Sequence, residues 1–277
     1  MNAQPDTAAV GAEAFSINVP DPLDQPSLKG KVNDEEWQLR CDLAATYRLC
    51  AHYNWDDMIF THISVRAPDD GGKARFLINP YGVMFDEMTA SCLLMIDIDG
   101  NPVGDSPYIA NPAGFTIHSA IHMARDDAHA VLHLHTPYGV AVSAQRGGLK
   151  RYSQFAMIVH DDLAYHDYEG IATDHDERAR IVKDMGNHGF LMLRNHGTLT
   201  VGQNCATAFM RMYFLEQACR AQILAQSDLK EPREEPPTMG AKVMQQGAPA
   251  FVPGLGDRLA WPGLLRKLNK VNPGYDQ

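Results

Sequence analysis

The chain has 277 residues, of which 45% are hydrophobic and 21% charged, and its formal net charge is −10. This balance is typical of an ordinary globular protein with one sizeable core, so we expect one domain with terminal extensions. The negative charge disfavours nucleic acid and anionic membranes as general partners, because both bind clustered Lys and Arg. The chain has no signal-like start and no run of the ~20 apolar residues that a bilayer requires. We therefore expect a cytoplasmic protein.

The five cysteines are an odd number, show no CxxC pairing and lie mostly in apolar, helix-like stretches. This usage predicts small buried thiols in a reducing compartment, without a disulfide framework.

The N-terminal part of the chain predicts an arm, a helix and a hairpin. Residues 1–32 carry four prolines and few aromatics, which favours an extended arm. Asn33 begins a capping-box-like pattern, and the core helix that follows is expected to end near Tyr53. The alternating stretches 60–66 and 75–79 flank a turn and are expected to pair as a hairpin.

Residues 33–228 are expected to form the main domain, and residues 229–277 a tail. The tail holds seven prolines among glycines, which predicts irregular chain packed on the core or on a neighbouring subunit. His62 and Ser64 share one face of the first hairpin strand. Periodicity predicts further strands at 91–97, 130–136, 155–159, 190–194 and 198–201, and helices at 114–125, 138–144, 174–186 and 204–227.

The run 130–136 carries the clearest chemical signal. Because side chains alternate along a strand, His133 and His135 project to the same face and the leucines between them to the other. Neutral imidazole suits zinc, manganese and iron, and His196, after another apolar strand, is the best third ligand. Ordinary buried histidines are an equal alternative on spacing alone.

Two other groups of polar residues are candidates for chemistry. His118 and His122 lie four residues apart on a helix, but without the glutamate of a zincin motif, packing or hydrogen bonding is favoured over metal binding. In the stretch 163–170, Tyr165 and His166 are residue types that can transfer protons. A solvated loop is an equal alternative there.

Between Trp37 and Ile223 the sequence resembles the class II aldolase/adducin family, and within it the adducin head-domain subgroup. The resemblance covers most of the chain and neither tail. It lies in seven blocks in the right order, namely 61–66 (Thr-His-Ile-Ser-Val-Arg), 76–82, 88–91, 113–121, 133–137 (His-Leu-His-Thr-Pro), 164–168 and 193–197 (Leu-Arg-Asn-His-Gly).

The resemblance implies a three-layer α/β/α domain around a central, mostly antiparallel sheet. It also implies a homotetramer with active sites between subunits. A divalent metal would be held by His133, His135 and His196, with zinc expected first and manganese or iron as alternatives.

The departures from the sugar-phosphate aldolases bear on the substrate. Their Ser-Ser-Glu triplet, which grips phosphate and supplies the catalytic acid/base, falls on Pro112, Ala113 and Gly114. The asparagine of their phosphate loop falls on His62, and a second loop becomes Asn79–Gly82. We therefore expect a non-phosphorylated substrate and no retro-aldol chemistry through that glutamate. The expected substrate-binding positions are His62, Asn79, Gly82, Gly114 and His118.

These features favour a metal-dependent carbon–carbon lyase, aldolase-like or a decarboxylase, acting on a small keto or hydroxy acid. Decarboxylation suits the missing glutamate because departing carbon dioxide needs no base. A water on the metal, His62, Tyr165 or His166 would supply protons. A mononuclear iron oxygenase is a variant of this hypothesis. A non-catalytic, adducin-like assembly protein is the alternative, but the sequence shows no counterpart of the Lys-rich adducin tail, and a scaffold needs no metal triad.

Overall fold

A sheet of seven strands runs through the part of the chain that the computed structural model describes, which is residues 19–170, 176–228, 232–251 and 256–277, without the side chains of 112–116 and 249–250. The strand order is β3-β2-β1-β4-β7-β6-β5. Every neighbouring pair is antiparallel except β5 and β6. The strands are β1 (His62–Asp70), β2 (Lys73–Ile78), β3 (Leu94–Ile96), β4 (Ala130–Leu134), β5 (Leu163–His166), β6 (Phe190–Leu193) and β7 (Gly197–Gly202).

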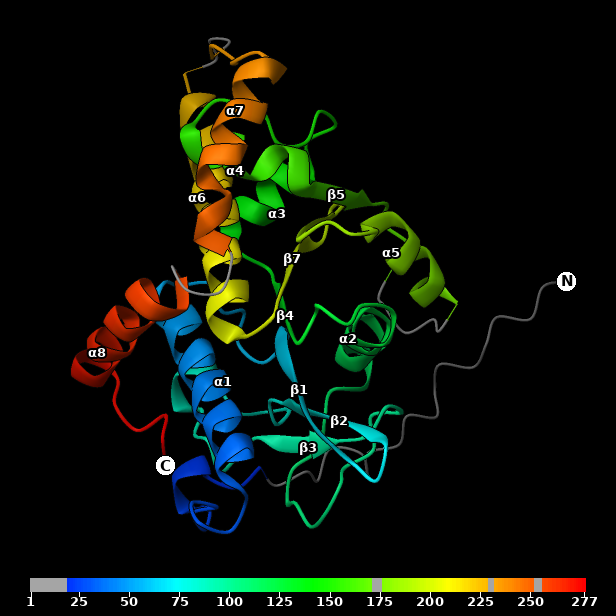
Figure 1. The fold of residues 1–277 in the computed structure, drawn as a ribbon, viewed down its shortest axis with the longest axis vertical. Helices are drawn as coiled ribbons and strands as arrows, with labels where there is room; N and C mark the ends of the chain where they lie inside the picture. The colour runs from blue at the N-terminus through cyan, green and yellow to red at the C-terminus, as the bar shows by residue number, and fades with distance from the viewer. Residues whose placement is uncertain (1–18, 171–175, 229–231, 252–255) are drawn as a thin grey trace, which may run out of the picture.

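Helices cover both faces of this sheet, as expected for three α/β/α layers. Figure 1 shows α2 and α5 on one side of it and α1 and α6 on the other. In β4 the side chains alternate accordingly, because Leu132 and Leu134 join the core beneath α1 and α6 while Val131 joins the core beneath α2 and α5. The helices are α1 (Asp34–His52), α2 (Pro112–Ala124), α3 (Pro137–Ser143), α4 (Gln154–Val159), α5 (Glu177–Met185), α6 (Cys205–Ala225), α7 (Pro237–Gly247) and α8 (Trp261–Val271).

The first helix is tied to the sheet by a buried tyrosine. The α1 helix begins as predicted, with the Asn33 side chain accepting a hydrogen bond from the Glu36 amide at 2.8 Å. The fully buried Tyr47 hydroxyl accepts from the Ile63 amide at 2.7 Å and contacts Asn79 Oδ1 at 2.8 Å. It therefore fixes the start of β1, where His62 lies, against the end of β2.

One predicted strand is a helix. Residues 155–159 were expected to be extended, but 154–159 form α4. The Ser153 side chain accepts a hydrogen bond from the Ala156 amide at 3.1 Å and so caps this helix. A short apolar run fits a buried strand and a buried helix equally well, and here the cap and the packing against α6 and α7 decide.

The C-terminal segment is not irregular, because it contains α7 and α8. Two of its prolines, Pro237 and Pro262, stand in the first turns of α7 and α8, where a missing N–H costs nothing. In α7, a Cβ at Gly247 would lie 2.6 Å from the Ile158 side chain, so glycine allows close packing on α4. In α8, the Trp261 indole donates to Asp42 at 3.1 Å. This segment therefore packs on the core of its own chain.

The described part of the N-terminal arm, residues 19–32, also packs on the core, while residues 1–18 lie outside the described part. The Leu28 amide donates to Ser91 Oγ at 3.1 Å, and the Tyr108 hydroxyl donates to the Pro20 carbonyl at 3.2 Å. The expected division of the chain at residues 32 and 228 stays a prediction. All five cysteines are buried and unbridged, as predicted.

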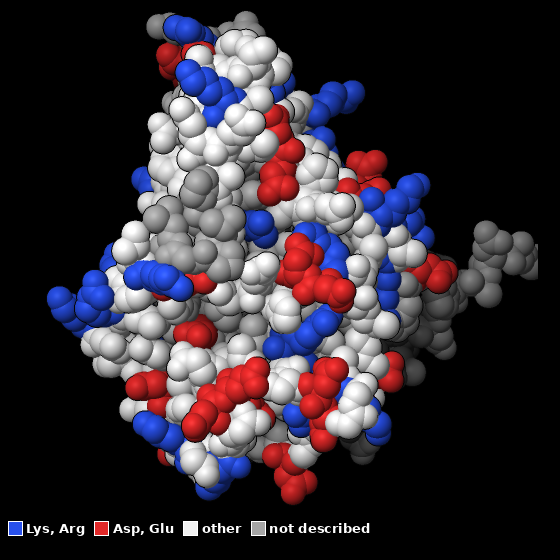
Figure 2. Space-filling model, viewed as in Figure 1, with Lys and Arg blue, Asp and Glu red and all other residues white. Residues whose placement is uncertain are grey.

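Charged side chains are interspersed on the surface. On the face of the described residues in Figure 2, acidic and basic groups alternate without forming a continuous basic area. Among the described helices there is none whose length and apolarity would let it span a bilayer.

A buried carboxyl group secures the segment that follows β4. Glu216 on α6 is only 3% exposed and accepts hydrogen bonds from Thr136 Oγ1 at 2.6 Å and from the Gly139 amide at 3.0 Å. These contacts hold the start of α3. Burial raises the pKa of Glu216 to about 7, and the hydrogen bonds only partly oppose that rise.

This raised pKa predicts a pH-dependent stability. The folded chain binds the Glu216 proton more tightly than the unfolded chain, so stability should fall as the pH rises from about 4.5 to about 7. Glu216→Gln keeps an acceptor oxygen and removes the charge. We expect the variant to be more stable than the wild type above pH 7, by about 1–3 kcal/mol, and similar near pH 5. Urea unfolding at both pH values measures this.

The control for this prediction is Asp69→Asn, which neutralises an exposed carboxylate. The control should keep the wild-type pH profile. An unchanged pH profile in Glu216→Gln would contradict the assignment.

Candidate metal centre

Three histidines from two segments far apart in the sequence converge at one end of the central strands. His133 lies on β4, His135 follows it directly, and His196 lies in the turn between β6 and β7. One ring nitrogen from each lies within 4.8 Å of the others, and the ring centroids are 4.7 to 5.0 Å apart. The structure thus brings together the three ligands expected from the sequence.

The backbone of the β6–β7 turn explains how His196 reaches the other two. Asn195 has φ of 58°, a left-handed conformation that asparagine tolerates better than most residues. Gly197 follows, and a Cβ there would lie 2.6 Å from the Leu134 carbonyl oxygen and 3.0 Å from the His135 ring. Only glycine allows β7 to pass this close to the end of β4.

Hydrogen bonds orient two of the rings. His133 Nδ1 donates to the Thr198 carbonyl at 3.1 Å, and His135 Nδ1 donates to Asp57 Oδ2 at 2.9 Å. A neutral imidazole that donates from Nδ1 has a free lone pair on Nε2. His135 Nε2 is buried and has no hydrogen-bond partner among the described residues. A buried, unpartnered nitrogen beside two other imidazoles fits a bound metal ion, which would satisfy it.

Burial keeps the other two rings in the form that binds metals. It lowers the pKa of His196 to about 4, with the neighbouring His135 as a smaller cause. It lowers the pKa of His133 well below its usual value, and His196 and His62 add to that effect. Both rings are therefore neutral at pH 7, and neutral imidazole is the metal ligand.

Asp57 is a site residue that the sequence did not reveal. It lies in the loop between α1 and β1, 78 positions before His135, so no spacing rule connects the two. The next residue, Met58, has φ of 48°, a strained conformation for a side chain of its size. A carboxylate behind a metal-binding histidine fixes the ring orientation and raises its basicity.

His62 and His118 lie beside the triad and contact each other. The ring centroids of His62 and His133 are 5.1 Å apart, and the two residues are paired across β1 and β4. His62 Nδ1 and His118 Nε2 are 2.8 Å apart. Burial lowers the pKa of His62 to about 3. His118 and His122 are hydrogen-bonded to β1, as favoured from the sequence, and neither is part of the metal-ligand group among the described residues.

Tyr165 and His166, the expected proton-transfer residues, are both engaged elsewhere. The Tyr165 hydroxyl accepts from the Leu149 amide at 3.0 Å. His166 is held between Asp184 at 2.8 Å and Glu177 at 3.3 Å. These hydrogen bonds hold both side chains in place within the fold. The catalytic roles of Tyr165 and His166 stay predictions without support from the geometry.

Three expected substrate-binding positions, Asn79, Gly82 and Gly114, either make other contacts or lie where the structure does not describe the neighbouring side chains. The Asn79 side chain is buried, and its oxygen is taken by Tyr47. Gly82 has φ of 103°, and a Cβ there would meet Val19 at 2.7 Å, which explains the glycine without a substrate. Gly114 lies in the first turn of α2, where the side chains are not described. No contact tests the substrate roles of these three residues.

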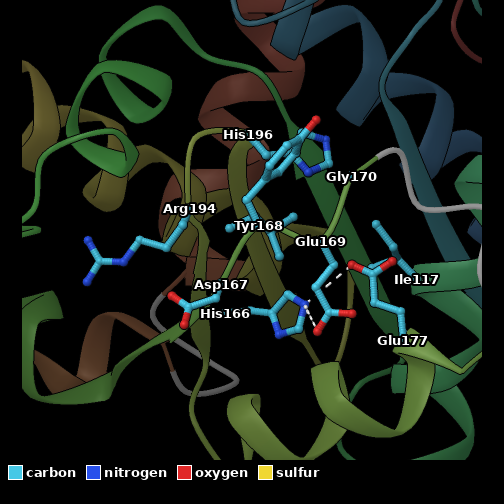
Figure 3. Close-up of a pocket in the computed structure, with 10 residues that line it drawn as sticks. Ile117, His166, Asp167, Tyr168, Glu169, Gly170, Glu177, Arg194 and His196 are labelled. Carbon is cyan, nitrogen blue, oxygen red and sulfur yellow. Dashed lines mark hydrogen bonds and ion pairs between the residues drawn. The ribbon is translucent and has the colours of Figure 1, made fainter.

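Tyr168 is the aromatic residue of this cluster that lies near the triad. Its ring centroid is 6.4 Å from that of His196, and the residue is 56% exposed. Figure 3 shows Tyr168 and His196 together at one end of a small pocket, with His166 and Glu177 at the other. The sequence pattern singled out the stretch 163–170 but not Tyr168 in particular. Only the structure shows that β5 ends at His166 and that Tyr168 lies in the exposed loop after it.

Comparisons with known proteins show what the whole chain is similar to. The sequence profile of the "Class II Aldolase and Adducin N-terminal domain" matches residues 41–223. A Caulobacter vibrioides protein, provisionally named an aldolase class 2 protein, is 53% identical over 249 residues, covering 90% of this chain and 96% of that protein. Mouse alpha-adducin is 39% identical over 219 residues, 76% of this chain but 29% of adducin. The crystal structure of an aldolase II superfamily protein from Pseudomonas syringae, 44% identical, has a TM-score of 0.85 and covers 91% of this chain and 100% of its own.

The glycine after His196 provides a first test of the centre. Gly197→Ala should push β7 away from β4, because the added Cβ would collide with a backbone oxygen that has no room to move. We expect zinc affinity to fall by at least about tenfold, which is ~1.4 kcal/mol of lost ligation. Competition with a chromophoric chelator measures the affinity. The control is Gly263→Ala in α8, where a Cβ meets only the Arg266 side chain at 3.8 Å. Equal affinity in both variants would be evidence against the close approach.

Asp57 provides a second test. Asp57→Asn keeps the size of the side chain but removes the charge that supports His135, so zinc affinity should fall by about 10–100-fold. The matched control is the neighbouring Asp56→Asn, which leaves the Asp57–His135 contact in place. The same chelator competition applies, and the idea fails if the two variants bind zinc alike.

Proposed function

Because the chain belongs to the class II aldolase and adducin N-terminal domain family, we propose that it is a metal-dependent carbon–carbon lyase, aldolase-like or decarboxylating. Its substrate is a small, non-phosphorylated keto or hydroxy acid. The observation that carries this proposal is the convergence of His133, His135 and His196 around the buried, unpartnered His135 Nε2. A protein that only assembles with others has no need of such a nitrogen.

The three imidazoles would hold a divalent ion, with zinc expected first and manganese or iron as alternatives. When bound, the ion supplies a Lewis acid that polarises a carbonyl or carboxylate oxygen of the substrate. The residues supply the rest. All three candidate ligands are uncharged donors, so they leave the positive charge of the site undiminished, and the Asp57 carboxylate orients the His135 ring from behind.

The proton-handling groups differ from those of a sugar-phosphate aldolase. The sequence has Gly114 where the catalytic glutamate would stand. Tyr168 offers a phenol in an open loop beside His196, and we assign it the proton-transfer role in place of Tyr165 and His166. Release of carbon dioxide requires no base at Gly114, provided that a carbonyl group beta to the carboxylate takes up the electron pair of the broken bond as an enolate. Decarboxylation of an acid with such a carbonyl is the variant that this chain supports best.

The surroundings of His196 favour a substrate without phosphate. Arg194 lines the same pocket, but its side chain is turned away from His196 in Figure 3 and donates to the Gln145 carbonyl at 2.9 Å. Its guanidinium also lies over the Tyr165 ring, 4.2 Å from the centroid. It is thus committed to the protein rather than to a phosphate.

We also propose that the enzyme is a cytoplasmic homo-oligomer, with a tetramer expected. Met58 and Phe60, in the loop that carries Asp57, are large apolar residues that are more than a third exposed. A second copy of the chain would cover them next to the metal centre. Light scattering of the purified protein tests the assembly.

The direct test of the lyase uses zinc-loaded protein and a panel of 2-keto and 2-hydroxy acids, with release of carbon dioxide or aldehyde as the readout. We expect turnover with at least one acid, and a loss of at least about 100-fold in His196→Ala, because a metal site with two ligands loses its ion. The control is His188→Ala, which removes a half-exposed imidazole outside the triad. Oxygen uptake by an iron-loaded sample would identify the oxygenase variant instead.

The second candidate function is a non-catalytic assembly protein. The similarity to alpha-adducin over three quarters of this chain favours it. A well-folded protein that binds neither zinc, manganese nor iron, and that shows no turnover with the panel, would select this alternative.

A further inference from the structure

A buried chain of hydrogen bonds runs from His62 into the layer between β1 and α2, and the candidate metal site does not use it. His62 and Ser64 belong to β1, and His118 and His122 to α2. All four are at most 5% exposed. The successive contacts are His62 Nδ1 to His118 Nε2 at 2.8 Å, His118 Nδ1 to Ser64 Oγ at 2.6 Å, Ser64 Oγ to His122 Nε2 at 2.7 Å, and His122 Nδ1 to the Ala128 carbonyl at 2.8 Å.

The carbonyl at the far end fixes the direction of the first two bonds. A carbonyl oxygen only accepts, so His122 Nδ1 carries the proton that it donates to Ala128. In a neutral His122 the other nitrogen, Nε2, then accepts. Ser64 must therefore donate its single hydroxyl proton to His122 Nε2.

The same logic propagates to His62. Because the Ser64 proton is already used, its oxygen accepts from His118 Nδ1. His118 Nε2 is then bare and accepts from His62 Nδ1. The chain of bonds therefore leaves one bare nitrogen, His62 Nε2.

The surroundings of the four residues keep the three rings neutral. Burial lowers the pKa of His122 to about 3 and that of His118 well below its usual value. The charged group that faces His122 is a cation, the Arg66 guanidinium, which donates to the His122 backbone carbonyl and lowers the pKa of the ring further. Among the described residues, no carboxylate contacts the side chains of this hydrogen-bond series.

The bare nitrogen lies next to the candidate metal site without belonging to it. The His62 ring packs against the His133 ring, but His62 is not in the group of ligand atoms that lie within 4.8 Å of one another. Its Nε2 has no hydrogen-bond partner among the described residues, and the residue keeps 5% of its surface exposed. It is therefore free to accept a hydrogen bond from a bound molecule.

We propose that His62 offers Nε2 as a hydrogen-bond acceptor to the substrate, and that His118, Ser64 and His122 are positioning residues that hold it in this tautomer. The consequence for the substrate class rests on the proposed function. The acid that binds at the triad carries a hydroxyl group next to its carboxylate, so it is a 2-hydroxy acid rather than a 2-keto acid. A keto oxygen, or a fully ionised phosphate, has no proton to donate and faces the lone pair unfavourably.

The tautomer is measured on the metal-free protein, by ¹⁵N NMR of the histidine rings at neutral pH. Wild-type His62 should show a protonated Nδ1 and a bare Nε2, with its signals assigned by their loss in His62→Gln. Ser64→Ala interrupts the series of hydrogen bonds and lets His118 and His62 adopt the reverse tautomers. A protonated Nε2 should then become populated at His62. The control is Thr200→Val, which removes another buried hydroxyl, bonded to the Ala208 carbonyl, from the same sheet. A protonated His62 Nε2 in the wild type would overturn the proposal.

The substrate preference is measured on the zinc-loaded protein, by calorimetry with glycolate, with methoxyacetate, in which a methyl ether replaces the hydroxyl, and with pyruvate, whose keto group is mostly unhydrated in neutral water. Wild type and Thr200→Val should bind glycolate about tenfold more tightly than either other acid, the value of one hydrogen bond. In Ser64→Ala this ratio should fall toward one. Equal binding of the three acids by the wild type would refute the acceptor role and leave the lyase proposal standing. A failure to bind zinc would instead refute the lyase proposal, and the metal-free NMR result would still decide the tautomer.

Discussion

The register of β4 with its two neighbours is the constraint on which the candidate site depends. Pairing with β1 sets His62 opposite His133. Pairing with β7 sets Leu134 opposite Thr198, which follows shortly after His196 in the chain. A slip of one residue in either pair would turn these side chains to the other face of the sheet. The leucines of β4, buried beneath α1 and α6, hold the register because they cannot be exposed without a large loss of apolar contact.

The candidate site consists of buried imidazole rings, most of which the fold keeps uncharged and hydrogen-bonded. Burial lowers the pKa of His62, His133 and His196, so none of these rings carries a charge that would need a buried counterion. Nearly every ring nitrogen behind the site has a partner, either a backbone carbonyl, a serine or another ring. His135 Nε2 and His62 Nε2 have no such partner among the described residues, and both lie where a ligand would complete them.

Much of the fold was predictable from local pattern. The first hairpin and the long helix α6 follow from alternation and helical periodicity, and the α1 start follows from the Asn33 cap. The wrong predictions came from residues that are compatible with two different local structures. Proline in α7 and α8 stands in the first turn, where it is allowed, and Gly247 serves close helix packing rather than a break. The apolar run in α4 is too short for its period to decide.

The sequence by itself determined the family, through seven blocks of residues in the right order, and it made the three histidines candidate ligands, because a strand projects both histidines of HxH to one face. Only the tertiary structure decided what surrounds them. Asp57 reaches His135 across 78 positions, Tyr168 rather than Tyr165 lies by His196, and the Ala128 carbonyl sets the direction of a hydrogen-bond chain that ends at His62. These relations depend on which segments pack together, and that is a property of the whole sheet and its helices rather than of any stretch of chain.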